Sequence, residues 1–70
     1  MRVNKIKLAR VEKGLSQTDL AEKVGVTRQT IGLIEAGKYN PTIKLCINIT
    51  KVLGKNLDEL FGEDWIQWKT

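Results

Sequence analysis

The sequence predicts a single all-α domain, folded as a compact five-helix bundle. Three observations support this prediction. Apolar residues recur at helical spacing in five short segments, a glycine follows each segment, and no segment alternates apolar and polar residues as a half-buried strand would. Seventy residues allow one domain with a thin core, so each helix has to contribute several buried side chains.

The first two helices are expected over residues 3–13 and 17–24. Ser16 is a good N-cap for the second helix, and Asp19 follows it at the spacing of a capping box. Gly25 ends the second helix, since the sharp turn after it requires a positive φ. The residues expected on the inner faces of these two helices are Val3, Ile6, Ala9, Arg10, Leu20, Ala21 and Val24.

Three more helices are expected, over residues 28–36, over residues 43–53, and from Asn56 to just before Gly62. Thr27 and Thr42 stand at the N-cap positions of the first two of these. The residues expected on the inner faces of the three helices are Ile31, Ile34, Ile43, Cys46, Ile47, Thr50, Leu53, Leu57, Leu60 and Phe61. We interpret the single cysteine as a small apolar core residue, and we expect the Thr50 hydroxyl to bond back to the helix backbone.

The composition excludes several classes of protein. The chain has no histidine and one cysteine, so it lacks the four ligands of a structural zinc site and cannot form an intrachain disulfide. It has no apolar run long enough to cross a membrane and no signal-peptide pattern, which predicts a cytoplasmic protein. It also has no thiol–base pair and no phosphate-cradling glycine loop, so we expect neither an enzyme nor a bound cofactor.

Basic charge lies on both sides of the central helices. Residues 1–14 hold five basic side chains and one acid, and residues 37–55 hold four lysines and no acid, within a net charge of +4. This arrangement suits a polyanion that is gripped on either side of an inserted helix. Charge alone is equally compatible with an ordinary soluble surface.

The central segment carries a resemblance to a known family. It is similar to the helix-turn-helix of the phage Cro and C1 repressors, the Xre family, over about residues 3–62. The resemblance implies a lambda-repressor-like bundle whose second and third helices form the motif, and sequence-specific binding of operator DNA, usually as a dimer. We therefore expect a DNA-binding domain at residues 1–62 and a short tail at residues 63–70. The matching segments are Leu15 to Ala21, Val24 to Thr27, Ile31 to Gly37, Asn40 to Ile43 and Leu57 to Phe61.

The resemblance assigns base reading to Arg28, Gln29, Thr30 and Leu33. Arginine can pair with guanine O6 and N7, and glutamine with adenine N6 and N7. Leu33 stands where the family often has a polar residue, so it can contact only a thymine methyl group or a sugar. Gly32 leaves a gap beside it. We expect base reading to rest on few side chains.

Other matching positions are assigned to the DNA backbone and to the scaffold. Gln17 opens the second helix, whose N-terminal N–H groups also favour phosphate. Arg10 and Glu35 match an ion pair that joins the first helix to the third and fixes the recognition helix. The residues expected to contact phosphate are Gln17, Thr27, Lys38, Tyr39, Asn40, Thr42 and Lys44.

Two apolar features depart from the family pattern. Leu8 and Val11 lie on a face of the first helix that is usually polar, and a tail with Trp65, Ile66 and Trp68 extends past the last helix. The tail can fold back on its own core or form a dimer contact with the fifth helix. It also leaves open an interaction module or an antitoxin, with the tail as the partner site. The residues expected in a dimer contact are Leu57, Phe61, Trp65 and Trp68.

Overall fold

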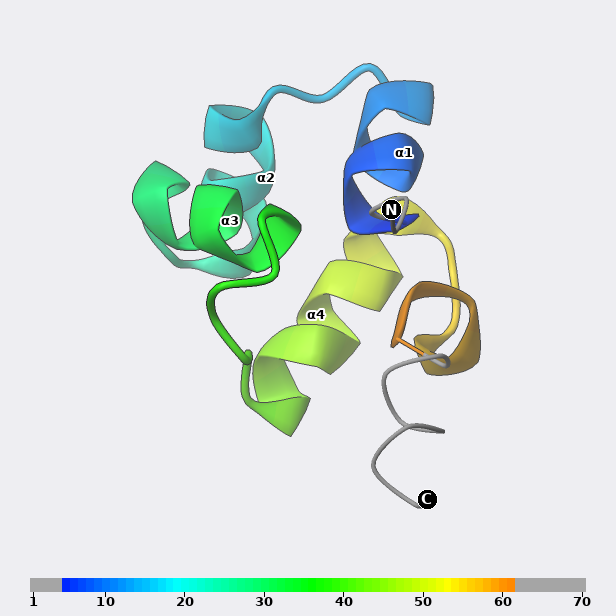
Figure 1. The fold of residues 1–70 in the computed structure, drawn as a ribbon. Helices are drawn as coiled ribbons and strands as arrows, with labels where there is room; N and C mark the ends of the chain where they lie inside the picture. The colour runs from blue at the N-terminus through cyan, green and yellow to red at the C-terminus, as the bar shows by residue number, and fades with distance from the viewer. Residues whose placement is uncertain (1–4, 62–70) are drawn as a thin grey trace.

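The computed structural model describes residues 5–61, and within them the chain is helical without strands (Figure 1). Four helices follow one another along the chain, and a further helical segment at residues 57–61 comes after them. The prediction of an all-α five-helix fold is confirmed. The four helices are α1 (Lys5–Glu12), α2 (Gln17–Val24), α3 (Arg28–Glu35) and α4 (Ile43–Leu53).

The helices begin where the sequence predicted caps. The Ser16 hydroxyl accepts a hydrogen bond from the Asp19 N–H (3.0 Å), and the Asp19 carboxylate accepts one from the Ser16 N–H (2.9 Å), which completes a capping box. Thr27 and Thr42 cap α3 and α4 with one bond each, their hydroxyl oxygens accepting from the N–H groups of Thr30 (3.2 Å) and Leu45 (3.2 Å). Gly25 ends α2 with a φ of 77°, a left-handed conformation that permits the tight turn into α3.

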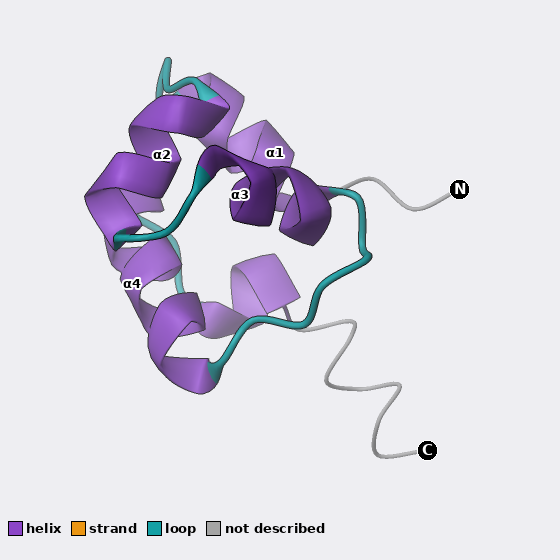
Figure 2. Cartoon of the chain, turned by 90° about the vertical axis from the view of Figure 1, so that its left-hand side faces the viewer, coloured by secondary structure: helices purple, strands orange, loops and turns teal. Residues whose placement is uncertain are grey.

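Helix α2 links the helices of the fold, because it packs against both α3 and α4. Figure 2 shows α3 facing the viewer, with α2 to its upper left and α4 to its lower left. The core is continuous across all the helices. Four side chains in it have almost no exposed surface, namely Leu20, Ile31, Ile49 and Leu53.

The inner face of α4 differs from the prediction. Ile43 and Ile47 were expected in the core, but they are 51% and 37% exposed. Leu45 and Ile49 are buried in their place. The physical reason is that apolar residues occur nearly all around this helix, so periodicity did not select one face. Packing against α2 selected it instead. The expected inward residues Cys46, Thr50 and Leu53 are buried.

Other details agree with the sequence or differ by a residue or two at helix ends. Buried Thr50 donates its hydroxyl to the Ile47 carbonyl (2.7 Å), as expected. Within the described residues α1 spans Lys5–Glu12, and it ends one residue before the predicted end. Val3, predicted on its inner face, lies outside the described residues.

Candidate nucleic-acid interface

Helix α3 has an anchored inner face and an open outer face. Ile31 and Ile34 are buried, which fixes the rotation of the helix about its axis. Arg28 and Gln29, in the first turn, are exposed, and Leu33 is 37% exposed. The structure therefore places three of the four predicted base-reading side chains on open surface.

Thr30, the fourth, is more constrained. It is half-buried, and its hydroxyl lies 3.0 Å from the Thr27 hydroxyl, which also accepts the Thr30 N–H. Sequence reasoning did not anticipate this side-chain contact, although the three-residue spacing after an N-cap threonine was the available signal. The contact orients both hydroxyls at the beginning of α3.

The end of α3 is tied to α1 through a buried ion pair. Arg10 Nε–H donates to Glu35 Oε2 (2.7 Å), and a second guanidinium nitrogen donates to Oε1 (3.2 Å). The two side chains are 9% and 4% exposed. A third guanidinium nitrogen donates to the Leu15 carbonyl (2.8 Å). The pair has the bidentate geometry that orients both partners most strongly.

Gln17 joins the same carboxylate from α2. Its side-chain amide donates to Glu35 Oε1 (3.1 Å), so one carboxylate holds the start of α2, the end of α3 and the last turn of α1. Gly32 faces this amide, and a Cβ on Gly32 would lie 4.0 Å from Gln17 Nε2. The gap predicted at Gly32 therefore adjoins the first turn of α2.

A basic and polar segment lies next to α3 in the chain. It forms the loop after α3 and the first turn of α4 (Figure 2). The Thr42 hydroxyl accepts the Leu45 N–H (3.2 Å) and keeps its own proton available to donate. Five residues of the segment that were predicted to contact phosphate are exposed, namely Lys38, Tyr39, Asn40, Thr42 and Lys44.

The residues predicted for a dimer contact divide into two groups. Leu57 is partly buried and packs on the core, and Phe61 is 8% exposed, so both side chains already have partners within their own chain. Trp65 and Trp68 lie outside the described residues. The dimer surface therefore stays a prediction.

Among the described residues, two side chains have clearly shifted pKa values. The Ser16 backbone N–H, with a smaller effect from the Ser16 hydroxyl, lowers the pKa of the Asp19 carboxylate. Burial raises the pKa of the Cys46 thiol, whose Sγ lies 3.9 Å from the Pro41 carbonyl oxygen. Residues 5–61 hold no cluster of three or more side chains that could bind a metal ion. In the same range, every helix is too short or too polar to span a bilayer.

A polar helix anchored across a tight glycine turn, with basic residues beside it, defines a helix-turn-helix protein. Comparison with known sequences agrees. A family model described as helix-turn-helix matches residues 6–60. The chain belongs to the Cro/C1-type helix-turn-helix family, whose members are DNA-binding regulators and not enzymes.

Individual relatives cover most of the chain. An uncharacterized HTH-type transcriptional regulator of Methanocaldococcus jannaschii is 48% identical over 58 residues, which are 83% of this chain and 88% of the relative. The HTH-type transcriptional regulator YgzD of Bacillus subtilis is 41% identical over 64 residues, 91% of this chain and 92% of its own. The immunity repressor protein of Bacillus phage phi105 is 33% identical over 60 residues, 86% of this chain and 42% of the repressor.

Proposed function

We propose that the protein is a sequence-specific transcriptional regulator that inserts α3 into the major groove of operator DNA. One observation carries the proposal: exposed Arg28 and Gln29 occupy the first turn of a helix whose opposite end is held by the buried Arg10–Glu35 pair. Helix-turn-helix proteins read bases with the N-terminal residues of this helix. A rigid scaffold keeps those side chains at a defined angle to the groove.

The phosphate contacts are assigned to both sides of α3. Gln17, at the start of α2, and Thr27, before α3, would contact one stretch of backbone. Lys38 and Lys44 would contact the other. Contacts of this kind set position and affinity, whereas base contacts set sequence preference.

We further propose that the protein is a cytoplasmic repressor that binds as a homodimer. A dimer places two copies of α3 one DNA turn apart, and bound protein then blocks access of other proteins to the operator. The similarity to a protein named an immunity repressor supports repression. The leading relatives are named transcriptional regulators without a stated direction of control.

Two substitutions test the assignment after the preferred site has been selected from a random duplex pool. Arg28→Ala is expected to weaken binding to the selected site by about 5–150-fold, the equivalent of roughly 1–3 kcal/mol, and to leave binding to random duplex nearly unchanged. Lys38→Ala is expected to weaken binding to both duplexes and to reduce the salt slope by about one. Fluorescence anisotropy at several salt concentrations measures both effects.

Lys51→Ala is the matched control, because Lys51 is an exposed lysine in the last turn of α4, two turns beyond Lys44. Its salt slope is expected to equal that of the unsubstituted protein. If Arg28→Ala and Lys38→Ala both bind as the unsubstituted protein does, the DNA assignment is wrong.

A protein-interaction module is the second candidate. It is favoured by the partly apolar surface of α3, where exposed Leu33 follows Gly32. Absence of binding to any selected duplex, and to random duplex near physiological salt, would support this candidate over the first. An antitoxin is a variant that retains DNA binding and uses the C-terminal tail for its partner.

A further inference from the structure

A hollow lies between α1 and the helical segment at residues 57–61. In Figure 1 these two elements lie on the other side of the molecule from α3. It has a volume of about 170 Å³. Leu8 and Ala9 line it from α1, and Leu60 lines it from the other wall. A buried apolar cavity of about 150 Å³ accepts a benzene molecule, so the hollow has the size of one aromatic ring.

Helix α1 exposes two apolar side chains, of which Leu8 lines the hollow. Leu8 is 52% exposed, and Val11, three residues further along the same helix, is 59% exposed. Residues three apart on a helix are neighbours, so the two side chains form one apolar strip. A small domain with a thin core gains from covering such a strip.

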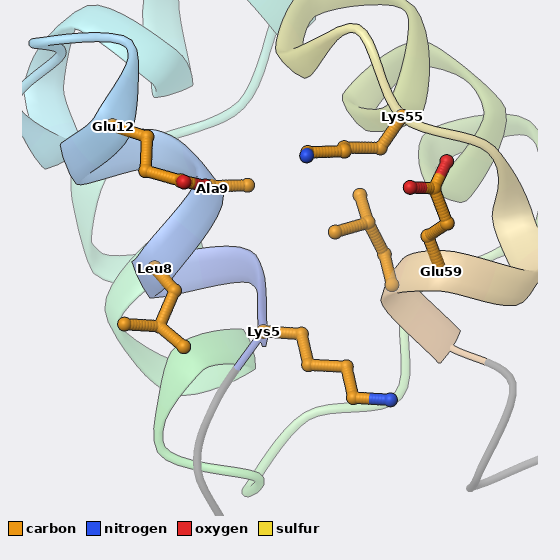
Figure 3. A pocket seen from close by; sticks show the side chains of 7 residues that line it. Lys5, Leu8, Ala9, Glu12, Lys55 and Glu59 are labelled. Atoms are coloured by element: carbon orange, nitrogen blue, oxygen red, sulfur yellow. The ribbon is translucent and has the colours of Figure 1, made fainter.

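The rim of the hollow also suits an indole ring. Figure 3 shows Lys5 extending from α1 and Lys55 from the other side, and the carboxylates of Glu12 and Glu59 also line the hollow. Lysine ammonium groups are attracted to the face of tryptophan more than to other aromatic rings. The aliphatic parts of both lysines add apolar surface to the walls.

We infer that the C-terminal segment of the same chain covers this hollow and places the Trp65 side chain against Leu8 and Leu60. Trp65 follows Leu60 by five residues, which span at most about 18 Å, so the segment starts at the wall of the hollow and Trp65 stays within that distance of Leu60. A tether this short gives the segment a high effective concentration at the hollow. A second copy of the chain has no such advantage.

With this docking, the tail would pack against the helices as a further element of the domain. Leu8 would then be part of the core of each single chain, and α3 would stay uncovered. The inference does not depend on DNA binding.

Tryptophan fluorescence tests the inference directly, since both tryptophans of the chain lie in this segment. With Trp68→Phe in the background, Trp65 is the only indole. Its emission in the full-length native protein is expected at a shorter wavelength than in urea, with reduced quenching by acrylamide. Adding Leu8→Lys is expected to shift the native emission to the longer wavelength seen in urea and to restore quenching.

Ile43→Lys is the matched control, because Ile43 is 51% exposed, as Leu8 is, but lies on α4 outside the hollow. It is expected to leave the Trp65 emission unchanged. Helical circular dichroism confirms that each variant is folded. A Trp65 emission that is already that of the urea state, or that Leu8→Lys does not move, overturns the inference.

Measurements at several protein concentrations distinguish docking of the chain's own tail from docking of the tail of a second copy. Docking within one chain predicts a Trp65 emission that is independent of protein concentration, with coupled losses of stability for Leu8→Lys and Trp65→Ser. Emission that shifts to longer wavelength on dilution, in step with dissociation measured by sedimentation, would assign the hollow to the tail of a second copy and overturn docking within one chain.

Discussion

At the scale of single residues, Glu35 receives three hydrogen bonds that come from two other helices. Two come from Arg10 and one from Gln17. Burying such a pair removes both charges from water, and the desolvation penalty offsets most of their attraction. The pair therefore contributes orientation more than net stability, since it fixes the last turn of α3 relative to α1 and α2.

The pair leads to a prediction with two parts. Glu35→Ala leaves the Arg10 charge buried without its partner, and the free energy of unfolding in urea is expected to fall by about 3–5 kcal/mol. The double variant Arg10→Met/Glu35→Leu is expected to recover most of that loss, because apolar side chains of similar volume then fill the site. Its affinity for the selected DNA site should remain reduced. Full DNA affinity in the double variant would show that the pair does not position α3.

Gly32 gives a prediction of the opposite sign. It lies inside α3, where glycine is less stable than alanine by about 0.5–1 kcal/mol, and a Cβ there would meet only Gln17 Nε2 at an ordinary contact distance of 4.0 Å. Gly32→Ala is therefore expected to raise the free energy of unfolding by roughly that amount in urea denaturation. Gly25→Ala is the control, because a φ of 77° strains alanine and should lower stability. A loss of stability in Gly32→Ala would contradict the argument.

At the scale of elements, helix starts were predictable and the face of α4 was not. Capping depends on residues within one turn of each other, so Ser16, Thr27 and Thr42 were identified from local sequence alone. The inner face of α4 depends on contacts with α2, a helix distant in sequence. Local sequence could not distinguish Ile47 from Ile49, because both fit an apolar stripe on this helix.

The α2 capping box predicts how stability responds to acid. Hydrogen bonds from Ser16 lower the pKa of Asp19 in the folded state, below the ordinary value of 3.8. A lowered folded pKa stabilises the protein above the unfolded pKa, and this contribution disappears as pH falls through the folded value. Asp19→Asn is therefore expected to flatten the pH dependence of the thermal midpoint below about pH 4, with less difference at pH 2 than at pH 6. Equal differences at both pH values would contradict this role.

At the scale of the whole molecule, the candidate site was assigned from the resemblance rather than from local pattern. Arg10 and Glu35 are separated by 25 positions, and no local rule pairs residues so far apart. The resemblance supplied their pairing, and the structure places them in contact. Neither local sequence pattern nor the family resemblance predicted the hollow beside Leu8, because it forms only when α1 and residues 57–61 pack together.

The dimer proposal predicts the symmetry of the DNA site. Two copies related by a two-fold axis bind inverted half-sites whose centres are about 10–10.5 base pairs apart. Duplexes selected from a random pool are therefore expected to contain an inverted repeat at that spacing. Inserting five base pairs between the half-sites rotates one of them by about half a turn, so binding to the site should fall to that of a single half-site, as measured by gel shift.

An insertion of ten base pairs restores the rotation but not the distance, so a protein–protein contact between copies predicts that this site also binds weakly. Selected sequences without symmetry, bound at a one-to-one ratio, would instead show a monomer that reads DNA with a single α3.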